Sequence, residues 1–346
     1  MSSLVQLLAA ATPRDRFLDG FRYPFLALVI AATVAWFLTP LVRKVAIDRG
    51  VIDDPKADDR RVHTEPIPRW GGIAIYAGIL ASLAAVLPFA YPHKPFPVYL
   101  VGILVCGAVI VVMGALDDLY KYSAKVQLLY IIGLAVAVQF FIGPAGQVQI
   151  HGFQPFWGKD LPWVDFAWAT VPLTAIYIFL ITKTMDTIDG IDGLAAGIAA
   201  ISSSTLAIIA VFSEQPRVAL VCAATGGAAL GFLRHNYNPA RIFMGTGGAQ
   251  LLGFMLASLT IVGAIKTAAA VALIIPVLVF GVPVFDAAFV VFRRILHRQP
   301  ITQADKRHLH HTLMSRGLNQ RQTVWILYSL AMLLCAILLV TVRTLG

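Results

Sequence analysis

The stretch PVYLVGILVCGAVIVVMGAL at 97–116, followed directly by DDLYK at 117–121, decides the fold. Its first part is an uncharged run of 20 residues, and a helix needs about that length to cross the hydrocarbon core of a bilayer. Two aspartates then stand where such a helix would leave the membrane, and charge at that depth is costly and marks a functional candidate. The stretch therefore predicts a membrane-spanning helix with polar chemistry at one end.

The composition extends this interpretation to the whole chain. Of its 346 residues, 58% are hydrophobic and 13% are charged, whereas soluble domains carry about 25% charged residues. The mean hydropathy of +0.78 is too high for one soluble core of this size. The net charge of +9 lies on no soluble domain, so we expect no nucleic acid as a partner. Anionic lipid and an anionic substrate account for it better.

The apolar runs predict an all-α, polytopic membrane protein with about ten transmembrane helices. The candidate spans lie at 23–42, 70–90, 97–116, 126–143, 166–182, 193–212, 218–234, 248–265, 268–292 and 323–342. No linker separates a second domain, so we expect residues 1–346 to form a single integral membrane domain. Cys106, Cys222 and Cys335 each lie in an apolar run and are expected to be small buried residues.

The cationic residues predict the orientation of the chain. If both termini lie outside, the inner loops fall at 43–69, 117–125, 183–192, 234–247 and 293–322. These loops hold 19 of the 27 Lys and Arg residues, as the positive-inside rule demands of cytoplasmic loops. They also hold most of the acids and histidines. We therefore expect a polar cleft on the cytoplasmic side, and a short irregular or hairpin outer loop at 144–165.

Two acidic segments are candidates for metal binding. Adjacent carboxylates at Asp117 and Asp118 invite magnesium, which binds a few carboxylates together with water and substrate phosphate. The alternative is a solvated helix end with an Asp117–Lys121 pair. The segment DTIDGIDGL at 186–194 adds three acids at a spacing of three, on neighbouring faces if the segment is helical. Its glycines permit sharp turns close to a ligand, although an acidic loop with turn glycines is the simpler alternative.

Two basic segments accompany the acids. HLHH at 308–311 follows DKR at 305–307, and imidazoles with cations suit a phosphate. A zinc site is one alternative, but no cysteine accompanies the histidines and the spacing fits no usual zinc motif. A basic loop on anionic lipid is the other alternative. RRVH at 60–63 and PIPRWGG at 66–72 form the second basic segment and lead into a predicted span.

Together these segments resemble the polyprenyl-phosphate N-acetylhexosamine-1-phosphate transferases, which are glycosyltransferase family 4 enzymes. The resemblance covers about 40–325 and rests on motifs in the family's order: HTEPIPRWGG at 63–72, DDLYK at 117–121, DGIDGL at 189–194, NYNPARIFMG at 236–245, PVFD at 283–286, Arg293-Arg294 and DKRHLHH at 305–311. The H-x-H-H form and the P-x-P-R-x-G-G loop resemble the N-acetylglucosamine branch and differ from the MurNAc-pentapeptide branch.

The resemblance implies a reaction and its partners. A UDP-sugar, expected to be UDP-N-acetylglucosamine, would give its sugar-1-phosphate to undecaprenyl phosphate and release UMP, with Mg²⁺ or alternatively Mn²⁺ as cofactor. The expected partners are the UDP-sugar, the polyprenyl phosphate and the lipid bilayer of a bacterial plasma membrane, with a homodimer left open.

The resemblance also implies site residues. The catalytic set is Asp117, Asp118, Asp189 and Asp192. The expected metal ligands are Asp118, which matches the family motif, together with Asp186 and Thr246, which depart from it and would serve in a rebuilt site. The substrate-binding set is His63, Arg69, Lys121, Lys183, Asn236, Arg294, His308, His310 and His311.

Three positions depart from the family pattern. The family has asparagine where this chain has Lys183 and Asp186, and a metal-binding aspartate where it has Thr246. One hypothesis is a rebuilt site, in which Asp186 supplies the carboxylate, Thr246 offers a hydroxyl to magnesium and Lys183 neutralises phosphate. The competing hypothesis is a catalytically silent relative that binds polyprenyl phosphate or acts as a scaffold. We favour the rebuilt site because the other acids and the histidine motif are present. A transporter is a third alternative, but the chain shows no paired halves.

Overall fold

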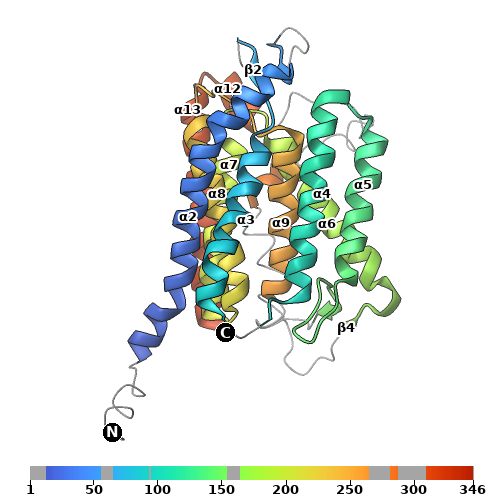
Figure 1. Cartoon of the computed structure of the whole chain (residues 1–346), viewed down its shortest axis with the longest axis vertical. Helices are drawn as coiled ribbons and strands as arrows, with labels where there is room; N and C mark the ends of the chain where they lie inside the picture. The colour runs from blue at the N-terminus through green and yellow to red at the C-terminus, as the bar shows by residue number, and fades with distance from the viewer. Residues whose placement is uncertain are drawn as a thin grey trace, which may run out of the picture.

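The protein is a bundle of long helices in its computed structural model, which describes residues 13–55, 65–92, 95–153, 164–264, 281–286 and 309–345. In this part of the chain, eight helices are long and apolar enough to cross a membrane. Figure 1 shows them packed side by side along the long axis of the molecule. The predicted all-α polytopic fold is therefore confirmed.

The elements alternate between long helices and short connections. The long helices are α2 (Pro13–Asp48), α3 (Gly71–Ala90), α4 (Val98–Tyr120), α6 (Thr170–Ile188), α7 (Leu194–Phe212), α8 (Pro216–Asn236), α9 (Gly245–Ala264) and α13 (Gln320–Leu345). The shorter elements are α5 (Ala124–Ala137), the 3-10 turns η2 (Val138–Phe140) and η3 (Ala167–Ala169), and α12 (Leu309–Ser315). Two antiparallel ladders pair β1 (Ile52–Asp53) with β2 (Ile67–Pro68), and β3 (Gly152–Phe153) with β4 (Val164–Asp165).

The interior of the bundle is formed by α7, α8 and α9, whose residues are mostly buried. α2 packs along α8, and α9 packs against α4 and α6. Small residues permit these contacts. A Cβ on Gly231 would lie 2.0 Å from the carbonyl oxygen of Ala32, so glycine is required where α8 crosses α2. Close backbone approach of this kind is how helices associate when lipid removes the hydrophobic driving force.

Most predicted spans coincide with helices. The predicted span 126–143 corresponds to the shorter helix α5 with η2, and the predicted span 268–292 lies outside the described residues apart from a helical segment at 281–286. The predicted outer loop at 144–165 contains the β3–β4 ladder, in agreement with the hairpin alternative. The assignment of residues 1–346 to a single domain stays a prediction.

The predicted inner loops are too long, because helices run into all of them: 43–69, 117–125, 183–192, 234–247 and 293–322. α4 continues to Tyr120, α6 continues to Ile188, and α9 already begins at Gly245. A helix satisfies its own backbone groups, so it can extend past the hydrocarbon core into the polar interface without cost. Asp117, Asp118 and Asp186 therefore stand on the last turns of helices, where the bundle fixes their directions, whereas Asp189 and Asp192 lie in the turn between α6 and α7.

Candidate active site

Charged side chains gather at the end of the bundle that carries β2 and α12 in Figure 1. At this end α4 and α6 finish, α9 begins, and the β1–β2 ladder lies alongside. All ion pairs between the described residues are found here: Arg69–Asp53, Arg69–Asp118 and Lys183–Asp186. This is the end that the sequence predicts to face inward.

Asp118, in the last turn of α4, is almost fully buried, with 1% of its side chain exposed. Its Oδ1 accepts hydrogen bonds from the backbone N–H and the hydroxyl of Thr246, each at 3.2 Å. Thr246 lies in the first turn of α9, where the helix dipole favours a negative charge. The Oδ2 of Asp118 is buried without a partner among the described groups. A buried acceptor left unpaired is costly, so this oxygen marks a place for a cation or a substrate donor.

Arg69 joins the end of α4 to the β1–β2 ladder. Its guanidinium donates to Asp118 at 3.3 Å and to Asp53, which is buried in β1. Burial opposes the charge on Arg69, but the neighbouring carboxylates of Asp118 and Asp53 raise its pKa. Arg69 therefore places a permanent positive charge beside Asp118.

The chain after Arg69 is held against the start of α9. Gly72 donates its backbone N–H to the carbonyl oxygen of Met244 at 2.9 Å. A Cβ on Gly72 would lie 2.4 Å from the backbone nitrogen of Gly248, so no other residue fits there. Trp70 adopts a φ of 84°, a left-handed conformation that costs a bulky residue about 1–3 kcal/mol and persists only where the surroundings enforce it. This docking brings the first turns of α3 and α9 together beside Asp118.

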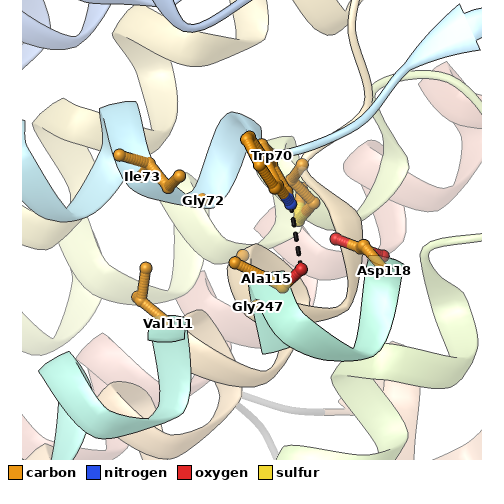
Figure 2. Close-up of a pocket in the computed structure, with 9 residues that line it drawn as sticks. Trp70, Gly72, Ile73, Val111, Ala115, Asp118 and Gly247 are labelled. Atoms are coloured by element: carbon orange, nitrogen blue, oxygen red, sulfur yellow. Dashed lines mark hydrogen bonds between the residues drawn. The ribbon is translucent and has the colours of Figure 1, made fainter. Parts of the chain in front are cut away.

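A narrow crevice between α3, α4 and α9 borders this contact (Figure 2). Trp70 covers it and donates from Nε1 to the carbonyl oxygen of Ala115 at 3.0 Å, while Asp118 supplies a polar wall. The rest of the lining is Gly72, Ile73, Val111, Met244, Gly247 and Gly248. The crevice has no room for a water molecule, so it is not a substrate pocket in this conformation.

The first carboxylate of the pair, Asp117, contacts a different set of groups. Its Oδ1 accepts the backbone N–H of Tyr122 at 2.9 Å, and Nε2 of Gln127 lies 3.1 Å from both of its carboxylate oxygens. Oε1 of Gln127 accepts a hydrogen bond from Nζ of Lys183 at 2.9 Å. Lys183 also pairs with Asp186, three residues on, at 2.5 Å. Two of the three residues that depart from the family pattern thus form an ion pair with each other.

The turn after α6 carries Asp189 and Asp192. Asp189 leaves the helix with φ −74° and ψ 44°, and Gly193 takes a left-handed φ of 81° before α7 begins. The three acids therefore do not continue along one helix, as they would if the whole segment were helical. Burial raises the pKa of Asp189 to about 8, and the nearby negative charge of Asp186 adds to this. Without a cation beside it, Asp189 is mostly protonated at neutral pH.

Asp192 and Asn236 fasten this turn to the connection between α8 and α9. Oδ2 of the buried Asp192 accepts hydrogen bonds from Asn238 and from a backbone N–H, at 2.9 and 3.0 Å. The amide of Asn236 bridges backbone groups of Gly193 and Ile242, at 3.1 and 3.0 Å. These contacts give both side chains a positioning role. Their predicted parts in catalysis and substrate binding stay predictions.

Three predicted site residues lie outside the described residues: His63, Arg294 and His308. His310 and His311 belong to α12. The first backbone N–H of this helix, on Leu309, donates to the buried Asp286 at 2.6 Å, which ties α12 to the segment 281–286. Lys121 follows α4 and is exposed.

The oxygen ligands at this end suit magnesium if substrate completes its coordination. Among the described residues, no three acidic, histidine or cysteine side chains converge as a metal-binding group. The unpaired Oδ2 of Asp118 is one available oxygen, and the hydroxyl of Thr246 lies next to the same carboxylate. Asp189 is close enough to feel the charge of Asp118. Because magnesium usually keeps several waters and binds substrate phosphates, one or two protein carboxylates are enough.

Sequence reasoning missed four polar residues of this cluster: Asp53, Gln127, Tyr130 and Gln250. Tyr130 donates to Oε1 of Gln250 at 2.5 Å, and Nε2 of Gln250 is buried without a partner among the described residues. Polar groups inside apolar spans are costly and are functional candidates by default. Gln127, Tyr130 and Gln250 each lie inside a predicted span, so that signal was present in the sequence.

Comparison with known proteins identifies the family. Residues 100–264 match the model for glycosyl transferase family 4. The chain is 34% identical over 302 residues to the "Probable undecaprenyl-phosphate N-acetylglucosaminyl 1-phosphate transferase" of Bacillus subtilis. The aligned residues cover 87% of this chain and 80% of that relative.

Two further relatives extend the comparison. A "Decaprenyl-phosphate N-acetylglucosaminephosphotransferase" of Mycobacterium tuberculosis is 33% identical over 326 residues, or 88% of this chain and 79% of the relative. An "Undecaprenyl-phosphate alpha-N-acetylglucosaminyl 1-phosphate transferase" of Escherichia coli is 26% identical over 305 residues, or 85% and 77%. The likeness spans the helices that carry the acidic cluster, and the chain therefore belongs to glycosyl transferase family 4, among the polyprenyl-phosphate N-acetylglucosamine-1-phosphate transferases.

Proposed function

We propose that the protein transfers N-acetylglucosamine-1-phosphate from UDP-N-acetylglucosamine to undecaprenyl phosphate and releases UMP, as the first membrane step in the synthesis of a cell-envelope glycan. Its relatives are named for this transfer to undecaprenyl or decaprenyl phosphate. A site at one end of a membrane bundle suits a lipid phosphate held at the interface and a soluble nucleotide sugar.

One observation carries the proposal: Asp118 is buried between Arg69 and the first turn of α9, and its second oxygen has no partner among the described residues. With one oxygen held by three donors, the other oxygen points in a fixed direction. Preorganised charge of this kind is what phosphoryl transfer needs, since positioning and electrostatic stabilisation supply most of its rate.

The chemistry is a displacement at phosphorus. An oxygen of the lipid phosphate forms a bond to the β-phosphorus of the UDP-sugar. The bond between that phosphorus and the bridging oxygen breaks, and UMP leaves with the electron pair. Both reactants are anionic, so fixed cations such as Arg69 and Lys183 lower the repulsion between them. We assign Asp117 to orienting or deprotonating the lipid phosphate.

The remaining roles follow the same reasoning. Asp189 and Asp192 would shape the nucleotide and metal site, and Lys121, Asn236 and Arg69 would border the substrates. His63 would lie at the lipid entrance. His308, His310, His311 and Arg294 would hold phosphates or the sugar.

We infer magnesium as the cofactor, with manganese as a substitute. When bound, it would screen the phosphates and orient the pyrophosphate. Asp118 and Thr246 would hold it, with Asp186 as the third predicted ligand. Asp186 is already paired with Lys183, so its part as a ligand requires that pair to open or to be shared.

The chain is a multi-pass membrane protein, and we propose that its polar end faces the cytoplasm of a bacterium. The support is the excess of Lys and Arg in the inner loops. UDP-sugars are soluble anions, so a cytoplasmic site would also give them direct access. The homodimer stays a prediction.

Thr246 alone does not favour a silent relative. Its backbone N–H and hydroxyl both hold Asp118, whereas an ionised aspartate at this position would have no side-chain donor for that carboxylate. No observation among the described residues favours the silent or the transporter alternative over the transferase.

The test is label transfer by purified protein in detergent, with magnesium, undecaprenyl phosphate and radiolabelled UDP-N-acetylglucosamine. We expect label in the lipid phase, release of UMP, and loss of both with EDTA. No lipid label with this or any other UDP-sugar would contradict the proposal and leave a lipid-binding relative.

A further inference from the structure

We propose that Gln127 is a positioning residue of the transferase site. From α5, it fixes the position of Asp117 on α4 relative to Lys183 on α6. The inference rests on the proposed function. No role for Gln127 follows from the acidic or basic motifs, because it lies in the apolar helix α5 after the DDLYK segment.

The contacts of Gln127 form a continuous chain from α4 to α6. Its Nε2 lies 3.1 Å from both carboxylate oxygens of Asp117, at the end of α4. Its Oε1 accepts from Nζ of Lys183 at 2.9 Å, and Lys183 is fixed in turn by Asp186 at 2.5 Å. A single side chain thus sets the distance between an anion and a cation that lie on separate helices.

A side-chain amide is suited to this role. It donates through nitrogen and accepts through oxygen, so it can face a carboxylate and an ammonium at the same time. Direct contact between Asp117 and Lys183 would make a charge-assisted pair that occupies both groups. With Gln127 between them, Lys183 keeps one of its three N–H groups for a phosphate oxygen. Its side chain is 40% exposed, which leaves it open to an anionic substrate.

The same arrangement accounts for two departures from the family pattern. Lys183 and Asp186 appear together where asparagines are expected, and they neutralise each other locally. The cation is then oriented by the amide of Gln127 on one side and by the carboxylate of Asp186 on the other. We infer that these three residues form one unit that presents Lys183 to substrate phosphate beside Asp117.

The first test is Gln127→Met, which keeps the length of the side chain and removes its hydrogen-bonding groups. Misplacement of reacting groups by about 1 Å can slow a reaction by about 100-fold, so we expect kcat per folded molecule to fall by roughly 10- to 100-fold. The KM for undecaprenyl phosphate should change by less than about threefold, since ground-state binding is largely kept. A purely structural role would lower the yield or Tm of folded protein and leave kcat per folded molecule unchanged, which would contradict the inference.

The second test exchanges the two partners. Gln127→Lys alone places two cations side by side, and Lys183→Gln alone removes the cation. The double variant, Gln127→Lys with Lys183→Gln, keeps one amide and one cation in contact but turns the cation toward Asp117 and away from the substrate side. Because Gln127 acts through Lys183, we expect the two losses to be less than additive, with kcat of the double variant within about threefold of that of the weaker single variant. Additive losses would overturn the proposed unit.

The matched control is Lys125→Gln, which removes an exposed lysine of the same helix. Its kcat should stay within about threefold of the unmodified protein, as expected for surface substitutions. A loss as large as that of Lys183→Gln would mean that any cation at this surface serves, and would contradict the inference.

If the unmodified protein transfers no label, the proposed function fails. If it is active and Gln127→Met is equally active, only this inference fails.

Discussion

The three departures from the family pattern differ in what they contact. Thr246 donates two hydrogen bonds to Asp118 at the start of α9. Lys183 and Asp186 instead pair with each other at the end of α6. Thr246 therefore holds the carboxylate of Asp118 at the N-terminus of α9, where the helix dipole favours a negative charge. Lys183 and Asp186 add an ion pair with no net charge to the site. Each of these contacts leads to a prediction that a single substitution can test.

Asp117→Asn and Asp118→Asn should each reduce turnover by roughly 100-fold or more, because each removes a preorganised charge at the reacting phosphates. Both amides are close in size to the carboxylates, so the proteins should remain folded in detergent by size-exclusion chromatography. Asp165→Asn, at an exposed site in β4 at the other end of the bundle, is the control and should keep its activity. If Asp117→Asn or Asp118→Asn kept full activity, the aspartate replaced in that variant would not belong to the active site.

The hypothesis that a carboxylate has moved from position 246 to Asp186 predicts that Asp186→Asn has different effects with and without Thr246→Asp. Asp186→Asn should lower activity, because it removes an oxygen ligand and releases Lys183 from its ion pair. Thr246→Asp combined with Asp186→Asn should restore activity at saturating magnesium, because a cation can bridge the new aspartate and Asp118. The measurement is label transfer over a magnesium titration. If Asp186→Asn alone leaves activity unchanged, the relocation hypothesis is wrong.

The raised pKa of Asp189 predicts that metal binding depends on pH. Burial, assisted by Asp186, raises the pKa of this carboxyl from 3.8 to about 8, so the neutral form prevails below that pH. A cation binds the ionised form and must displace the proton. Magnesium affinity should therefore rise with pH, by up to about tenfold per pH unit, and level off above about pH 8.

Calorimetric titration with magnesium between about pH 6.5 and about pH 8.5 would measure this dependence and the proton release that accompanies it. Asp189→Asn removes the titrating group and should flatten the profile. A rise of the same steepness in that variant would show that another group carries the proton.

At the scale of elements, the site depends on how closely α4 and α9 approach. A Cβ on Gly114 of α4 would lie 2.2 Å from the Cα of Gly247 of α9. The contact fixes the depth at which Asp118 meets the first turn of α9. The β1–β2 ladder contributes in the same way, because it carries Asp53 and leads directly to Arg69.

Gly114→Ala should therefore destabilise the protein by about 1–3 kcal/mol or more, since an overpacked contact between two backbones has no flexible side chain to yield. We expect a lower Tm in detergent and a loss of activity as α4 and α9 separate. Gly133→Ala is the matched control: Gly133 lies in helix α5 with no atom within 4 Å of a Cβ. This change should stabilise by up to about 1 kcal/mol, because alanine is the better helix former. Equal Tm values for the two variants would contradict the packing argument.

At the scale of the molecule, the candidate active site and the β3–β4 ladder lie at opposite ends of the bundle. The ion-paired acids and cations of the candidate site belong to the end with β2 and α12, and β4 lies at the opposite end (Figure 1). The proposed orientation places the first end in the cytoplasm. It can be tested by labelling because the three native cysteines are buried and should give little background.

Ser123→Cys, in the exposed connection between α4 and α5, should react with a membrane-impermeant maleimide only after the cells are opened. Ala145→Cys, exposed before β3, should react in intact cells. The measurement is the fraction of protein labelled before and after permeabilisation. The reverse pattern would invert the proposed orientation and would place the UDP-sugar site outside the cytoplasm.

The sequence by itself determined the class of protein and the family. Apolar runs such as 97–116 are read correctly because lipid requires each span to satisfy its own backbone. Motifs such as DDLYK and DGIDGL placed the acids at one membrane face, since a motif is a local property of the chain. The ends of α4, α6 and α9 were misjudged because hydropathy falls at the interface while the helix continues.

Only the tertiary structure decided which side chains meet. Gln127 and Lys183 are 56 residues apart in the chain and lie in contact, and Arg69 meets both Asp53 and Asp118. Such contacts depend on the rotation and depth of each helix, which are set by backbone packing at residues such as Gly72 and Gly114. Hydropathy carries no information about rotation, so the sequence could supply the charged groups of the site but not the bonds between them.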